Sequence, residues 1–397
     1  MTTEQGGNER AQSLRHLIAL GFCLPTAMYL TASLMFVSPY SATFYISGWF
    51  RPTYGHGIYR YRWLGQELIL KTGSLTHYLG IHLHTASADG ISGHKAWDLF
   101  SAFVIVNGIA FVATALILYA ATVRHREWIA AYLILISLLL ASMYVIEPWD
   151  CLVHLFMVAS VVVAAAARPW SWPVCLILAI AGTATHEQFL VVVALLAACL
   201  VVRPGGPRGE EGRWHLLPRR GDWFAASTAA VAVGSLGTYA LLRVIMASPH
   251  ELQTFSASGP IWFAWAENQN MSSAIAGMIV VLGLVSLILE LPRFSSTDPN
   301  RRRTYLWGTA LLWLFSGPYL AVSVLEGVWF EGVRLMLPVI ICQYLLRWLT
   351  SRGVLDASDI GGADVREFDS EVGDVVPMPS SSSPSGSLTS GSRNPTI

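Results

Sequence analysis

Residues 171–202 read SWPVCLILAIAGTATHEQFLVVVALLAACLVV, and this stretch decides the fold. Its two apolar halves flank the polar run Thr185-His186-Glu187-Gln188. A helix needs about 20 apolar residues to span the hydrocarbon core of a bilayer, so this stretch is too long for one crossing and too short for two. We therefore predict a helical hairpin whose tip, at His186 and Glu187, is sunken below the membrane surface beside protein or water.

The rest of the chain has the same apolar character. Of its 397 residues, 54% are apolar and 13% are charged, which predicts that the bilayer is its solvent. Because lipid offers no hydrogen bonds, long apolar runs must be helical. The predicted fold is all-α: a polytopic integral membrane protein with about ten transmembrane helices and short sunken helices on the outer side. The predicted spans are 16–37, 99–122, 128–146, 151–167, 172–185, 187–202, 223–246, 272–291, 305–325 and 332–349.

The arginines predict the orientation, because basic residues collect in cytoplasmic loops. Sixteen arginines fall at the N-terminus and on alternate connections between the spans. This distribution predicts a protein of the cytoplasmic (inner) membrane with both termini on the cytoplasmic side. The sixteen arginines are Arg10, Arg15, Arg124, Arg126, Arg168, Arg203, Arg208, Arg213, Arg219, Arg220, Arg293, Arg301, Arg302, Arg303, Arg347 and Arg352. Residues 1–15 are then a cytoplasmic N-terminus and 16–350 a transmembrane domain with an outer loop at 38–98. The acidic, serine-rich segment 351–397 is predicted to be a disordered cytoplasmic tail.

Charge and motifs exclude several classes of function. The 25 basic and 25 acidic residues cancel, and only Lys71 and Lys95 are lysines, so no basic face exists for nucleic acid. The sequence contains no phosphate-binding loop and no dinucleotide fingerprint, and we predict no cofactor. The five cysteines lack pairing or metal-ligand spacing and are interpreted as core residues.

Carboxylates at the outer ends of spans are the candidate catalytic groups, because charges near a membrane interior are costly and therefore mark functional sites. Asp150 is the preferred general base for an acceptor hydroxyl, followed by Glu187 and Glu147. The alternative is that these carboxylates only cap the helices that follow them.

Arginines on the same side are candidates for binding a phosphate, since the guanidinium is a permanently charged fork. The predicted substrate-binding residues are Arg60, Arg62, Glu67, His186, Arg243, Glu331 and Arg334. Contact with lipid head groups is the alternative for Arg60 and Arg62, and an i,i+3 ion pair with Glu331 is the alternative for Arg334.

No metal site is predicted. The spacing of His77, His82 and His84 matches no zinc signature, and the i,i+4 pair Asp150 and His154 lacks a third ligand in the sequence.

Three segments resemble bacterial multi-spanning proteins of the GT-C glycosyltransferase superfamily. They are Tyr59-Arg60-Tyr61-Arg62-Trp63-Leu64, His186-Glu187-Gln188-Phe189-Leu190, and Glu331-Gly332-Val333-Arg334 ahead of Pro338. The resemblance covers residues 14–350. The chain departs from the superfamily pattern because residues 38–66 contain no acidic residue and Glu67 comes late.

The resemblance implies transfer of a sugar from a polyprenyl-phosphate donor to an acceptor hydroxyl outside the cytoplasmic membrane. A carboxylate would deprotonate the acceptor, and arginines would stabilise the departing phosphate. Membrane lipids and the lipid-linked sugar are then the expected partners. The alternative is a multi-span transporter or a flippase for lipid-linked sugars, although the sequence shows no internal repeat of the kind common in transporters.

The predicted orientation is testable by cysteine labelling. Single cysteines introduced as Gly212→Cys and Val328→Cys should react with a membrane-impermeant maleimide from opposite sides of sealed vesicles, because the two positions fall on connections of opposite orientation. Labelling of both from the same side would refute the topology, and the chain without an introduced cysteine gives the background.

Overall fold

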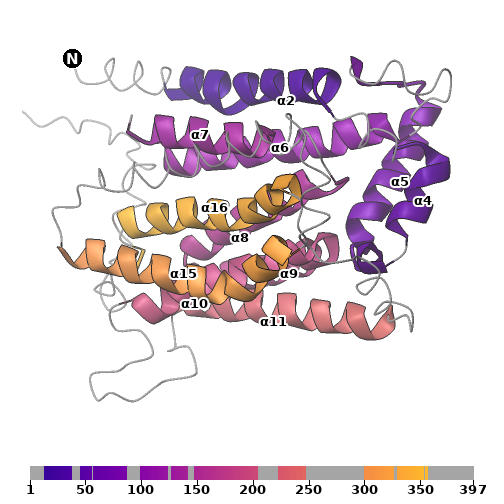
Figure 1. Ribbon diagram of the computed structural model, residues 1–397. Coiled ribbons are helices and arrows are strands. Elements are labelled where there is room, and N and C mark those ends of the chain that lie inside the picture. The colour runs from indigo at the N-terminus through magenta and orange to yellow at the C-terminus, as the bar shows by residue number, and fades with distance from the viewer. Residues whose placement is uncertain are drawn as a thin grey trace, which may run out of the picture. The chain divides into compact units, whose positions relative to one another are not determined.

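The computed structural model describes residues 13–37, 45–55, 57–86, 99–123, 127–141, 147–203, 222–246, 299–325, 329–352 and 354–355. Within these ranges every regular element is a helix (Figure 1). In chain order the elements are η1 (Leu17–Cys23), α2 (Leu24–Met35), α4 (Ser47–Tyr54), η2 (Gly57–Tyr61), α5 (Trp63–Tyr78), α6 (Phe100–Thr122), α7 (Glu127–Ala141), α8 (Asp150–Ala165), α9 (Ser171–Thr185), η5 (Glu187–Phe189), α10 (Leu190–Val202), α11 (Trp223–Ile245), α15 (Pro299–Leu325) and α16 (Trp329–Ser351).

Sequence and solvent together explain why these segments are helical. The segment of α10, LVVVALLAACLVV, is rich in β-branched residues that favour strands in water. In an apolar medium a helix satisfies its own backbone groups within one segment, which outweighs that preference. Where α11 begins, Asp222 accepts a hydrogen bond from the Ala225 backbone N–H at 3.1 Å and caps the helix.

Helix α8 lies at the centre of the packing. It contacts α6, α9, α10, α11 and α16, so its first residue, Asp150, is surrounded by other helices. Helix α9 in turn packs along α11, where a Cβ at Gly234 would approach Ala179 Cβ to 3.0 Å. Small residues at this contact let the two backbones approach closely, as is typical of helices in membranes.

Among the described residues, three helices are long and apolar enough to cross a membrane: Ser13–Met35, Phe100–Thr122 and Trp223–Ile245. Apolar side chains on α11, among them Val233, Val244 and Ile245, are more than half exposed. Such a surface fits contact with lipid and indicates membrane association.

The count of ten spans is not confirmed. Helices occupy nine of the ten predicted segments, but several, such as α9 and α10, are shorter than a full crossing. The predicted span 272–291 lies outside the described residues, as do 1–12 and the tail from 356 onward.

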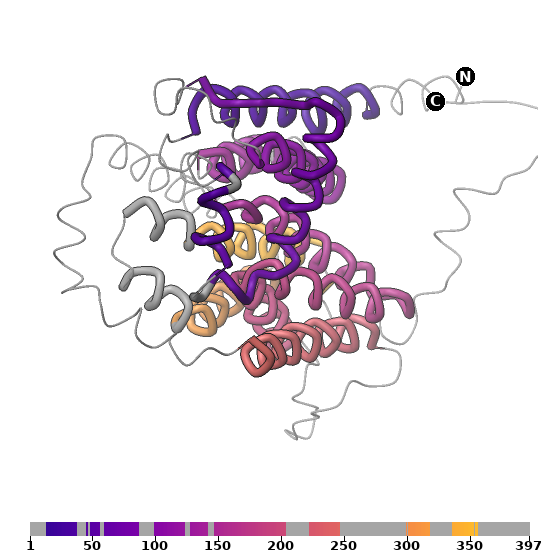
Figure 2. The backbone as a smooth tube through the Cα atoms, turned by 90° about the vertical axis from the view of Figure 1, so that its right-hand side faces the viewer, coloured from indigo at the N-terminus to yellow at the C-terminus, as the bar shows by residue number. Residues whose placement is uncertain are grey.

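The predicted outer loop, 38–98, contains helices for which the sequence had given no bounds. Helices α4, η2 and α5 lie together at one end of the longer helices (Figures 1 and 2). Helix α5 buries Gly65, Ile69, Gly73 and Thr76 and packs against α6 and α9. A search for 20 apolar residues overlooks such a helix, because it has 16 residues and polar ones such as Gln66, Glu67 and Lys71 interrupt it.

Candidate functional site

The tip of the hairpin between α9 and α10 depends on a close contact between Gly182 and Phe189. Helix α9 ends at Thr185, and His186 then takes an extended conformation with φ −162° and ψ 137°. The Phe189 ring folds back so far that a Cβ at position 182 would lie 2.2 Å from its Cδ2 atom. Only glycine permits this approach, which sets His186 and Glu187 at the turn. The break in the helix falls where the sequence predicted it.

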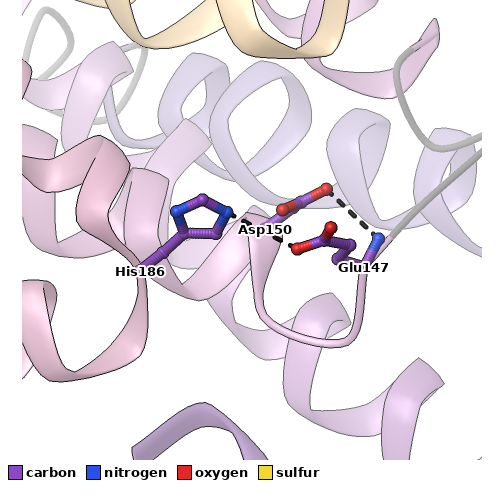
Figure 3. A group of neighbouring side chains, drawn as sticks. All are labelled: Glu147, Asp150 and His186. Atoms are coloured by element: carbon purple, nitrogen blue, oxygen red, sulfur yellow. Dashed lines mark hydrogen bonds and ion pairs between the residues drawn. The ribbon is translucent and has the colours of Figure 1, made fainter. Parts of the chain in front are cut away.

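The His186 ring holds the turn and has a defined tautomer. Its Nδ1 atom accepts a hydrogen bond from the Gln188 backbone N–H at 3.1 Å. A nitrogen that accepts from an N–H carries no proton, so the neutral ring carries its proton on Nε2. The Nε2 atom lies 3.5 Å from Glu147 Oε2, toward which it is directed (Figure 3).

A second turn, Glu147 to Asp150, leads into α8. The Glu147 backbone N–H donates to Asp150 Oδ2 at 3.2 Å. Asn107 on α6, which is fully buried, donates to the Pro148 carbonyl at 2.8 Å and accepts from the Cys151 backbone N–H at 3.2 Å. The amide of Asn107 thus fastens both sides of this turn to α6. The carboxylate of Asp150 thus serves the backbone of the turn before α8, and its role as a cap of α8 stays a prediction.

Arg62 joins the two turns at the start of α5. Its guanidinium makes two hydrogen bonds with Glu187, from Nη2 to Oε1 at 2.6 Å and from Nε to Oε2 at 3.1 Å. The Nη1 atom donates to Glu147 Oε2 as well. The side chain is only 4% exposed and lies over the rings of Tyr59 and Trp149, at 4.8 and 5.6 Å from their centroids. One arginine therefore links segments 85 and 125 positions away in sequence.

Trp149 completes the wall around Arg62. Its indole N–H donates to Glu147 Oε2 at 2.9 Å. Tyr54 packs edge-on against the indole at 5.1 Å between ring centroids. A Cβ at Gly65 would approach Trp149 Cβ to 2.7 Å, so α5 fits against the indole only because residue 65 is glycine.

The electrostatics of the site are dominated by Arg62. Its guanidinium favours the charged forms of Glu147 and Glu187, to which it donates hydrogen bonds. Burial lowers the pKa of Arg62, and these two glutamates more than compensate, leaving it above its ordinary value. One guanidinium therefore pairs with two carboxylates in a site whose third carboxylate is Asp150.

Donor atoms of Glu147, Asp150 and His186 lie within 4.8 Å of one another, which is close enough to surround a metal ion (Figure 3). The chemistry of the donors argues against that use. The lone pair on His186 Nδ1 is engaged by Gln188, and Nε2 carries the proton. Glu147 Oε2 already accepts from Arg62 and Trp149. A metal would need these bonds to break, so the arrangement suits proton transfer better than cation binding.

The other predicted site residues lie apart from this cluster or outside the description. Arg60 in η2 is exposed, and Glu67 is half-buried on α5. Arg243, near the end of α11, is half-buried with its guanidinium 3.9 Å from the Tyr61 ring centroid. Glu331 and Arg334 fall in the first turns of α16, but their side chains lie outside the described part, so their predicted ion pair stays a prediction.

One residue of the site, Asn107, and the pairing of Arg62 with two glutamates were not predicted from the sequence. Asn107 was missed although a single amide in the apolar run 100–122 is itself a signal, since buried polar groups need partners. The partners of Arg62 were missed because its guanidinium was predicted to bind a phosphate.

Comparison of the chain with protein-family models, curated proteins and solved structures finds no match. The resemblance to the GT-C superfamily therefore stays a prediction.

Replacing Arg62 with lysine should destabilise the fold. Lysine keeps the charge but cannot make the two-pronged bond to Glu187 and reach Glu147 at once, so we expect a loss of about 1–3 kcal/mol. Thermal unfolding of the purified protein in detergent measures it. Arg60→Lys is the matched control, because Arg60 is exposed in the same segment, and it should change stability by less than about 0.5 kcal/mol. Equal unfolding temperatures for wild type and Arg62→Lys would contradict the structural role.

Proposed function

We propose that the chain is a membrane glycosyltransferase that moves a sugar from a polyprenyl-phosphate donor to an acceptor hydroxyl on the extracytoplasmic face of the cytoplasmic membrane. The proposal includes the ten spans and the cytoplasmic termini. The observation that supports it best is the cluster of Arg62, Glu147, Asp150, Glu187 and His186, all buried except the half-buried Glu187, where three helical segments meet in a largely apolar chain. Ionisable groups in such surroundings are costly and are characteristically functional.

Asp150 is the proposed general base. Arg62 stabilises the charged forms of Glu147 and Glu187 through ion pairs, and a carboxylate whose charged form is stabilised in this way is a poor proton acceptor. In the proposed step the acceptor hydroxyl gives its proton to Asp150 while its oxygen bonds to the anomeric carbon. The bond from that carbon to the phosphate oxygen breaks, and the lipid phosphate departs with the bonding electrons.

Arg243 is the proposed partner of the departing phosphate. Arg62 is engaged by two carboxylates, whereas the guanidinium of Arg243 lies over the ring of Tyr61, the residue that precedes Arg62 in sequence. Beside it on α11, Leu241, Val244 and Ile245 are exposed apolar residues. A cation at the edge of a lipid-compatible surface suits the phosphate of a lipid whose chain stays in the bilayer.

The rival proposal is a transporter or flippase for lipid-linked sugars, which would use the same buried charges to bind its cargo without breaking a bond. The two differ in the product: only the transferase releases free polyprenyl phosphate.

Asp150→Asn should abolish transfer without unfolding the protein. The purified chain is incubated with undecaprenyl-phosphate-linked mannose, glucose or arabinose and a cell-envelope extract as acceptor, and released undecaprenyl phosphate is measured. We expect turnover by the wild type and a loss of about 10²–10⁴-fold in the variant, because the amide cannot take a proton. Asp222→Asn is the control: Asp222 caps α11 and pairs with Arg203, so this variant should lose stability but keep turnover. Full turnover by Asp150→Asn would remove it as the base, and no release by wild type on any donor would favour the transporter.

Arg243→Lys should lower kcat/KM in the same assay by about tenfold, equivalent to about 1.4 kcal/mol, because lysine keeps the charge but loses the flat fork. Arg352→Lys is the matched control, since Arg352 also lies over an aromatic ring, Trp348, at 5.5 Å. An unchanged kcat/KM in Arg243→Lys would exclude the phosphate role.

A further inference from the structure

Two buried side chains at the hairpin tip have polar atoms that make no hydrogen bond to any described residue. Gln188 is 1% exposed, and neither its amide nitrogen nor its amide oxygen is bonded. His186 is equally buried, and its Nε2 atom makes no hydrogen bond. A buried polar group without a partner loses its bonds to water and gains none in return, so each such group in a folded protein requires an explanation.

A second buried glutamine shows the usual arrangement. Gln343 on α16 donates from Nε2 to Tyr305 Oη at 2.5 Å and to Thr309 Oγ1 at 2.9 Å. Its Oε1 atom accepts from the Trp313 indole N–H at 3.2 Å. The same side chain, similarly buried, is thus fully bonded between α15 and α16. The lack of partners at Gln188 is a property of its location.

The unbonded atoms define the chemistry of what they would bind. The Gln188 amide offers two N–H donors and one acceptor oxygen, and the His186 tautomer adds an N–H donor. A ligand that fits must both accept and donate, which hydroxyl groups do. The carboxylates of Glu147 and Glu187, each 3.5 Å from a ring nitrogen of His186, disfavour an anion here. A metal cation finds no lone pair on His186.

We propose that Gln188 and His186 bind the hydroxyl groups of the sugar being transferred, and that Gln188 selects the sugar-bearing lipid over the bare lipid phosphate. This inference rests on the proposed function, and it adds a substrate class and a specificity residue to the site. The phosphate at Arg243 and the sugar at the hairpin tip then occupy separate parts of the site, one cationic and one neutral. Binding the sugar supplies the bonds that the turn lacks.

The test compares two glutamine-to-methionine variants of the full chain, because methionine has nearly the length of glutamine but no polar amide. Unfolding temperatures in detergent are measured for Gln188→Met and Gln343→Met. Dissociation constants are measured calorimetrically for undecaprenyl phosphate and for undecaprenyl-phosphate-linked mannose, glucose and arabinose. For wild type, at least one sugar-bearing lipid should bind more tightly than undecaprenyl phosphate.

Gln188→Met should keep or raise the unfolding temperature, since it removes only unbonded polar atoms. It should also lower the affinity for that sugar-bearing lipid at least tenfold, without changing the affinity for undecaprenyl phosphate. Gln343→Met should lower the unfolding temperature and leave the preference for the sugar intact. A fall in unfolding temperature, or failure to fold, in Gln188→Met would mean that the amide is bonded within the fold, and would overturn the inference.

The remaining outcomes separate this inference from the function on which it rests. If wild type and Gln188→Met prefer the sugar-bearing lipid equally, the inference is wrong and the transferase proposal stands. If wild type binds no sugar-bearing lipid more tightly than undecaprenyl phosphate, the inference is overturned, and the release of undecaprenyl phosphate in the turnover assay decides separately on the transferase.

Discussion

The arrangement of the helices around the site depends on the guanidinium of Arg62. A charge in an apolar interior is stable only with a partner of opposite sign and with its hydrogen bonds made. Here one cation satisfies two glutamates on two different turns, and removal of Arg62 would leave both glutamates without their partner of opposite charge. The start of α5, the approach to α8 and the tip between α9 and α10 must therefore come together as a unit.

The same interaction gives the acidic groups of the site different roles. Glu147 and Glu187 are held in their charged form by the guanidinium, which makes them good structural anchors and weak bases. Around them, the N–H groups of Trp149 and Asn107 fix the positions of a Glu147 carboxylate oxygen and of the Pro148 carbonyl oxygen. The proposed base, Asp150, lies in the turn that these bonds hold.

Local patterns in the sequence predicted the helical character of the chain and the break at His186, because apolar runs and their interruption by polar residues are local properties. They also selected Arg62, Glu147, Asp150, Glu187 and His186, which the structure brings together. The pairing of Arg62 with glutamates was beyond the sequence, since it depends on the rotation and register of helices far apart in the chain. Helix α5 escaped detection because its buried stripe is mostly glycine and threonine rather than large apolar residues. The predicted substrate-binding roles of Glu331 and Arg334 stay predictions.

The brevity of α9 has a consequence for the shape of any acceptor. Its 15 residues give a helix about 22 Å long, against about 30 Å for the hydrocarbon core. If α9 starts at the cytoplasmic boundary, the hairpin tip ends below the opposite boundary, at the bottom of a depression. In the proposed reaction, the rim of this depression would keep an acceptor hydroxyl on the broad surface of a folded protein away from Asp150. An acceptor hydroxyl at the tip of a slender chain, such as the end of a glycan or an unfolded peptide, would reach Asp150.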